Sequence, residues 1–214
     1  MKRINLNGII NLQTVCGTYE WYWGMDYTGG DLYEAQELFE KGDIICTHLY
    51  MIHYPDGKVY NISLGGKGRY FGVPVYDNGT IAILVVDFIK KVIEISHIKC
   101  EYNGTINIIK MTELPLCSVE DCYNLRLHTS PLMLTRHTSD NYFEIIWAER
   151  IKFTVGKRES FQFREGNKLY FSTWCEYPKY KEEVIVRSLF DGSIVETFLG
   201  DVYIMPNGEK WNIV

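Results

Sequence analysis

The sequence has 214 residues, of which 46% are hydrophobic and 23% charged, and this ordinary globular composition excludes an intrinsically disordered chain. The formal net charge is −5 and the longest basic cluster is Lys67-Gly68-Arg69, which excludes nucleic acid as the main partner because phosphates require a face rich in lysine and arginine. Aromatic residues make up 14%, with 16 tyrosines, and this excess suits either half-buried strands or a ligand-binding surface.

The N-terminus and the apolar runs indicate a cytosolic protein without a membrane partner. Met1-Lys2-Arg3 is not followed by an apolar segment, so we expect no secretory signal. The longest mostly apolar run, Ile81 to Val86, is far shorter than the roughly 20 residues of a membrane-spanning helix. In a cytosolic chain of this size we expect the cysteines to be reduced and mostly buried small hydrophobes. The six are Cys16, Cys46, Cys100, Cys117, Cys122 and Cys175.

A short phrase recurs along the chain and predicts repeated hairpins. It begins with Asn7-Gly8, Asn78-Gly79 and Asn103-Gly104, and each time an alternating apolar segment follows. Asn-Gly favours a tight hairpin turn because both central residues of a type I′ turn need positive φ. Residues 2–15 are therefore predicted to form one or two strands.

One short helix is predicted at about 31–41, directly after an aromatic stretch that ends in Gly29-Gly30. Asp31 has the properties of an N-cap, and Glu34 follows it at the spacing of a capping box. Gly42 supplies the C-terminal stop. The apolar residues at helical spacing are Leu32, Ala35, Leu38 and Phe39.

From residue 44 onward the apolar pattern changes to a period of two, which predicts strands joined by short turns. Examples are the strands at 47–54 and 58–62, separated by Pro55-Asp56-Gly57. The pattern breaks at Leu114-Pro115-Leu116 and then continues to the C-terminus. The whole chain is predicted to hold about eighteen strands, with no alternation of strands and helices.

This rhythm of strands resembles a small β-propeller of about five blades. Hairpins that recur about every 25 residues, as at 78 and 103, imply four-stranded units of blade size. We therefore predict an all-β, propeller-like single domain over residues 1–214, with a β-sandwich or open twisted sheets as the alternative. A β chain carrying a helical segment at 31–39 is also similar to bacterial proteins without an assigned activity, and this resemblance implies no function.

The stretch from Trp21 to Asp31 is the candidate ligand-binding site. Trp21, Trp23 and Tyr27 can stack against a sugar ring or a planar ligand, and Asp26 can accept hydrogen bonds or act as an acid or base. The alternative is that the tryptophans pack in the core while Asp31 caps the helix.

No metal site and no cofactor are predicted. Cys117, Cys122 and His128 have the spacing C-x4-C-x5-H, whereas structural zinc sites use tighter pairs that occur twice. His48 and His53 lie an odd number of residues apart on one strand, so they point to opposite faces. The nucleophile, phosphate-loop and dinucleotide motifs are all missing from the sequence.

The sequence favours a non-catalytic binding or interaction protein whose partner is a small polar ligand or another protein. The alternative is a small carbohydrate-active hydrolase, which needs two carboxylates that face each other across a pocket. The candidate carboxylates are Asp26, Asp31, Asp87, Glu113, Asp121 and Glu144.

Overall fold

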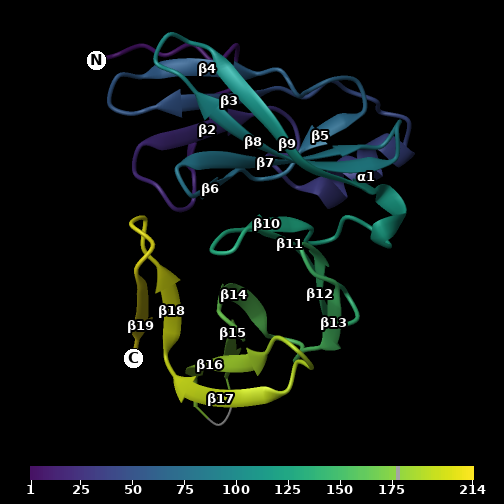
Figure 1. Ribbon diagram of the computed structural model, residues 1–214, viewed down its shortest axis with the longest axis vertical. Coiled ribbons are helices and arrows are strands. Elements are labelled where there is room, and N and C mark those ends of the chain that lie inside the picture. The colour runs from purple at the N-terminus through teal and green to yellow at the C-terminus, as the bar shows by residue number, and fades with distance from the viewer. Residues whose placement is uncertain (177–178) are drawn as a thin grey trace. The chain divides into compact units, whose positions relative to one another are not determined.

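A computed structural model describes residues 1–176 and 179–214 of the chain. The chain forms two compact units, Met1–Leu127 and His128–Val214, and each is described by itself. The described residues contain nineteen strands, one α-helix and one short 3-10 helix (Figure 1). The predicted all-β class with one short helix is confirmed, while the prediction that all 214 residues form one domain stays a prediction.

The first sheet is a four-stranded antiparallel meander in the order β1-β2-β3-β4. The turn before β4 contains Gly57 at a φ of 72°, and its N–H donates to the carbonyl of His53 at 2.8 Å. The strands are β1 (Gln13–Thr14), β2 (Trp21–Met25), β3 (Leu49–His53) and β4 (Lys58–Ile62).

The second sheet has the order β5-β7-β8-β9, and β6 also pairs with β7. Asn78 and Gly79 join β6 to β7 with φ angles of 47° and 84°, as the predicted type I′ turn requires. The strands are β5 (Arg69–Phe71), β6 (Val75–Asp77), β7 (Thr80–Asp87), β8 (Val92–Cys100) and β9 (Ile106–Pro115), after which η1 (Leu116–Ser118) follows.

The prediction for residues 2–15 is largely wrong. Asn7 and Gly8 do form a turn with φ angles of 51° and 93°, but the next strand, β1, is only two residues long. Ile10 and Leu12 are 91% and 48% exposed, whereas Leu6 and Ile9 pack against Tyr50 and Ile52 of β3 without pairing as a strand. A turn signal produces a hairpin only where a neighbouring strand can pair with the segment.

Helix α1 (Leu32–Glu40) lies between β2 and β3 in the chain and confirms the helix predicted at 31–41. Asp31 Oδ1 accepts hydrogen bonds from the N–H groups of Tyr33 and Glu34 at 2.9 and 3.1 Å. At the other end, the N–H of Gly42 donates to Phe39 and that of Asp43 donates to Leu38, both at 3.0 Å. These two bonds, with Gly42 at a φ of 88°, form a Schellman motif.

Removal of the N-cap should weaken the protein measurably. Asp31→Ala is expected to lower the free energy of unfolding by about 1 kcal/mol, because two amide donors lose their acceptor. Glu37→Ala on the same helix removes only an exposed ion pair with Lys41 and should cost a few tenths of a kcal/mol, about the worth of such a pair. Urea denaturation of the two variants measures both values, and equal losses would contradict a capping role for Asp31.

The second unit contains two further meanders and a hairpin. The boundary between the units falls within β10 (Arg126–His128), which begins the sheet β10-β11-β12-β13 with β11 (Met133–His137), β12 (Tyr142–Trp147) and β13 (Ile151–Thr154). The next sheet is β14 (Ser160–Glu165), β15 (Lys168–Cys175), β16 (Lys181–Ser188) and β17 (Ile194–Leu199), followed by the hairpin β18 (Asp201–Ile204) and β19 (Lys210–Ile213).

Meanders of this kind are the building units of β-propellers, so the sheets are of the predicted type. The described residues form four of them rather than about five. The strand count is close to the predicted one. The number of meanders is lower than predicted because β18 and β19 pair only with each other and do not complete a further four-stranded sheet.

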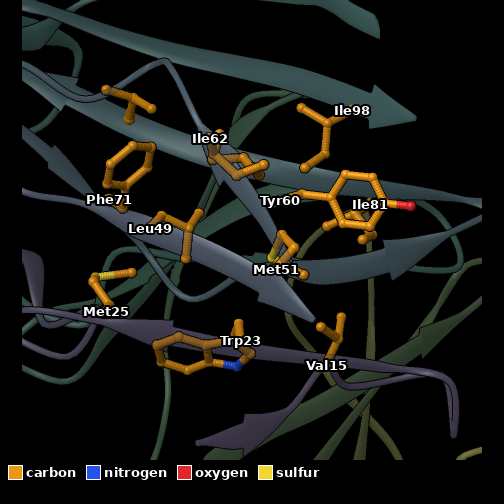
Figure 2. Close-up of a cluster of buried hydrophobic side chains, with 12 residues drawn as sticks. Val15, Trp23, Met25, Leu49, Met51, Tyr60, Ile62, Phe71, Ile81 and Ile98 are labelled. Carbon is orange, nitrogen blue, oxygen red and sulfur yellow. The ribbon is translucent and has the colours of Figure 1, made fainter. Parts of the chain in front are cut away.

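Each unit has its own hydrophobic core. In the first unit, side chains of both sheets meet, among them Trp23, Met51, Phe71 and Ile81 (Figure 2). In the second unit, Phe143 and Phe171 are 1% and 0% exposed, and their ring centroids lie 5.1 Å apart in an edge-to-face contact. No helix among the described residues has the length and apolar character needed to cross a membrane.

Buried and partly buried ion pairs support the sheets. Arg187 binds Glu159 through two hydrogen bonds of 2.7 Å, and it also donates to the carbonyl of Gly192 at 2.6 Å. In the first unit, Arg69 donates to Glu94 at 2.8 and 3.2 Å and to Asp87 at 3.2 Å. Each guanidinium group thereby neutralises carboxylates that would be costly to bury without a partner.

Candidate functional site

The tryptophans of the predicted site lie in or against the core of the first unit. Trp23 is 2% exposed within the core cluster, where Figure 2 shows its ring beside Val15 and Met51. Trp21 is half-buried, and its ring centroid lies 4.9 Å from that of His53 and 5.7 Å from that of Tyr60. These contacts are packing contacts, as the alternative interpretation of the stretch predicted.

Asp26 lies in the turn after β2 and holds His48 in place. Its Oδ1 accepts the backbone N–H of His48 at 2.7 Å, and its Oδ2 lies 2.7 Å from His48 Nδ1. When His48 Nδ1 carries the proton in this bond, Nε2 is left as a hydrogen-bond acceptor on a half-exposed ring. The carboxylate of Asp26 thereby fixes the orientation of an imidazole that can accept a proton. Tyr27 beside it is 64% exposed, with a φ of 57°.

Asp31 lines a small pocket at the N-terminal end of α1, with a volume of about 190 Å³. Gly29 and Gly30 contribute to the same pocket, as does Tyr33, whose ring meets that of Tyr123 edge-on at 5.4 Å. Of the five predicted site residues, Asp31 lines this small pocket, and none of the five lines the larger pocket beside the C-terminal half of α1. A ligand-binding role for the five residues stays a prediction.

A larger pocket lies within the first unit, beside the C-terminal half of α1, and has a volume of about 580 Å³. Phe39 and Phe88 stack within its lining, with ring centroids 5.3 Å apart and planes inclined by 24°. Pro115, Leu116 and Val119 supply the rest of its apolar lining. The helix, the β7–β8 turn and the segment after β9 therefore build one apolar hollow.

Hydrogen bonds hold residues 115–122 against the helix and the β7–β8 turn. The N–H of Leu116 donates to the carbonyl of Lys91 at 2.8 Å, and the N–H of Cys122 donates to Gln36 Oε1 at 2.9 Å. Gln36 Nε2 in turn donates to Glu40 Oε1 at 2.8 Å, which orients the amide. These bonds hold the backbone of a segment that lines the pocket against two other elements.

Polar groups surround the apolar lining. Glu40 on α1 and Lys91 on the β7–β8 turn are both exposed and line the pocket with opposite charges. The exposed Cys117 brings a thiol to the same pocket. A hollow of this kind can hold an apolar body and orient it by a few polar contacts.

The thiols should differ widely in reactivity. Burial raises the pKa of Cys100 from an ordinary 9.0 to about 11, which lowers its thiolate fraction near pH 8 about a hundredfold. Cys117 and Cys46 are exposed, whereas Cys122 is 1% exposed. We expect a maleimide at pH 8 to modify Cys46 and Cys117 first, Cys100 more slowly, and Cys122 only after unfolding.

Peptide mapping by mass spectrometry after timed labelling measures this order. Labelling in denaturant is the control, because all six thiols should then react. If Cys100 in the folded protein reacts as fast as Cys117, the pKa assignment is wrong.

Over residues 1–176 and 179–214, no group of three or more His, Cys, Asp or Glu side chains is placed to hold a metal ion. Cys117 and Cys122 instead line the larger pocket, on the segment that carries η1. The pattern break at residues 114–116 was the sequence signal for this segment. Its contact with Gln36 spans 86 residues, which sequence periodicity does not report.

The sequence matches no protein-family model, and no curated protein sequence shows significant similarity to it.

Proposed function

We propose that this protein is a binding protein whose ligand site is the 580 Å³ pocket beside α1. Pockets that hold small molecules typically measure about 300–1,000 Å³ and are lined mainly by apolar and aromatic side chains with a few polar groups. The pocket has this size and this lining, and its volume is the observation that carries the proposal. The stacked pair Phe39 and Phe88 suits a ligand with an aromatic or flat apolar body.

The fixed walls support the same proposal. The segment 115–122 is tied to α1 and to the β7–β8 turn by two backbone donors, so little ordering is needed when a ligand enters. A pocket that exists before binding avoids part of the entropy cost of association.

Titration with the fluorescent apolar probe N-phenyl-1-naphthylamine tests the proposal. Cys117→Trp places a large side chain in the pocket from an exposed position, so saturable probe fluorescence should be lost while the melting temperature stays near that of the wild type. Cys46→Trp is the matched control, since Cys46 is also exposed and does not line this pocket. Equal probe binding by the wild type and Cys117→Trp would overturn the proposal.

A hydrolytic function is the second candidate, and one observation favours it. Three carboxylates, those of Glu40, Glu120 and Asp121, line the same pocket. Glycoside hydrolysis requires one of the two carboxyls to stay protonated in an apolar setting, whereas Glu40 and Glu120 are exposed to solvent. Of the other candidates, Asp87 and Glu144 are bound by Arg69 and Arg136, so binding ranks above hydrolysis.

Chromogenic glycosides separate the two candidates. Turnover that Glu40→Gln abolishes without a change in melting temperature would favour the hydrolase, and probe binding without turnover favours the binding protein.

A further inference from the structure

The hairpin formed by β18 and β19 (Figure 1) packs one of its two faces against side chains of the second unit. Val202 lies with Phe163 in a buried core cluster, and Lys210 Nζ lies 4.6 Å from the centroid of the Phe163 ring. Lys210 Nζ also lies 3.2 Å from Glu165 Oε1. Successive residues of a strand point to opposite faces, so the residues next to Val202 and Lys210 lie on the other face of the hairpin.

Two aromatic residues occupy that other face. Tyr203 and Trp211 lie directly opposite each other in the ladder and are 52% and 49% exposed. Trp211 Nε1 donates a hydrogen bond to Glu209 Oε2 at 3.2 Å, which restrains the indole. Exposed aromatic side chains that are held in place provide a large contact area at a small cost in conformational entropy, and they are enriched in protein interfaces. This face therefore has the composition of a contact surface.

The charge on this face is negative. Glu209 lies on the same face as Trp211, since it accepts the hydrogen bond of the indole. Lys210 is the one positively charged residue between positions 201 and 213, and it is bound to Glu165 on the other face. A negative surface with exposed aromatic rings is complementary to a positively charged partner.

Acidic residues continue beside the hairpin. The hydroxyl of Tyr180 donates a hydrogen bond to Glu182 Oε1 at 2.6 Å. This bond is the main reason that the pKa of Tyr180 is raised, and the charges of Asp201 and Tyr203 raise it further. Tyr180 therefore lies within electrostatic range of Tyr203, and it brings the carboxylate of Glu182 to the same region.

An exposed ring elsewhere in the second unit already binds a cation of this chain. Tyr142 is 37% exposed, and Lys152 Nζ lies 4.6 Å from the centroid of its ring. In the part of the chain that the structure describes, no lysine or arginine lies over the ring of Tyr203 or Trp211. These two rings are therefore available to the cations of another molecule.

We propose that the face of the β18–β19 hairpin that carries Tyr203 and Trp211 binds a basic segment of another protein, whose lysine or arginine side chains lie over the two rings. Small molecules bind mainly in concave pockets, whereas an exposed strand face suits an extended segment. The contact is small and partly electrostatic, so it should be weak and should weaken further as salt is added. This surface belongs to the second unit and is independent of the ligand site proposed for the first.

Fluorescence anisotropy of a fluorescein-labelled hexalysine peptide, titrated with the full chain at low ionic strength, tests the proposal. The wild type should bind the peptide saturably. Tyr203→Leu and Trp211→Leu should each raise the dissociation constant about two- to fivefold, the effect of losing one exposed ring beneath a cation. Both residues are half-exposed, so their melting temperatures should stay near that of the wild type. Glu209→Gln keeps an acceptor for the indole and removes the charge, and it should also weaken binding.

Tyr142→Leu is the matched control. It removes an exposed tyrosine ring that Lys152 already covers, so this variant should bind hexalysine like the wild type. A wild type that does not bind hexalysine overturns the proposal. Unchanged binding by the double variant Tyr203→Leu/Trp211→Leu also overturns it, because the peptide must then bind elsewhere. The same holds if a hexaserine peptide binds as tightly as hexalysine, since the positive charge would then play no part.

Discussion

Replacing Arg187 with methionine is expected to lower the free energy of unfolding by about 3–5 kcal/mol, the cost of leaving a buried charge without its partner. Glu159 is 6% exposed and receives two hydrogen bonds of 2.7 Å from Arg187. In the variant, its carboxylate has to be protonated or remain buried without the guanidinium. The carbonyl of Gly192 also loses a donor. Chemical denaturation followed by circular dichroism measures the change.

The chain contains a matched control for this prediction. Arg164 and Glu149 form the same two-bond pair, at 3.0 and 3.2 Å, but the Glu149 side chain is 44% exposed. Arg164→Met should therefore cost about 0–1 kcal/mol, as solvent-exposed pairs usually do. The double variant Arg187→Met/Glu159→Met should lose much less than the sum of the single losses, since no unpaired charge remains. Equal losses in Arg187→Met and Arg164→Met would falsify the assignment of a buried pair.

Trp23→Ala is expected to cost about 3–5 kcal/mol, the usual range for deleting a fully buried large aromatic side chain. Trp23 is 2% exposed within the core of the first unit, so the deletion leaves a cavity among the two sheets. Tyr27→Ala in the same aromatic stretch removes a ring that is 64% exposed and should stay within about 0.5 kcal/mol of the wild type. Thermal and urea denaturation of both variants measure the contrast.

A conservative substitution isolates one part of this cost. Trp23 Nε1 is buried and has no hydrogen-bond partner among the described residues. Trp23→Phe removes that unsatisfied donor along with part of the ring, so its cost should be much smaller than that of Trp23→Ala. A loss in Trp23→Phe as large as in Trp23→Ala would show that the indole is needed for more than its volume. Ligand tests of the stretch are therefore better made with Tyr27→Ala and Asp26→Asn.

Local signals predicted the parts of the fold that depend on neighbouring residues. The helix follows from Asp31 and Gly42, because the hydrogen bonds at these two positions are made with the first and last turns of the helix itself. The β6–β7 turn follows from Asn78-Gly79. The same signal at Asn7-Gly8 did not produce a strand, because strand formation also depends on a partner that the phrase does not contain.

The candidate site depends on contacts between residues far apart in sequence, and these were not predictable from local patterns. Asp26 was a predicted site residue, but its bond to His48 crosses 22 residues. The side-chain amide of Gln36 fixes a backbone segment 86 residues away, a contact that helical periodicity does not report. Helical periodicity placed Phe39 on the apolar face, and the stacking partner Phe88 was visible only in the structure.

The anchoring of residues 115–122 has a consequence for the motion of the pocket. The amide hydrogens of Leu116 and Cys122 are held by Lys91 and by Gln36, so each exchanges with solvent only when the segment separates locally from its neighbours. A molecule bound in the pocket would oppose this local separation of residues 115–122 from their neighbours. The exchange rates of these two amides therefore record occupancy of the pocket even when the rest of the protein does not change.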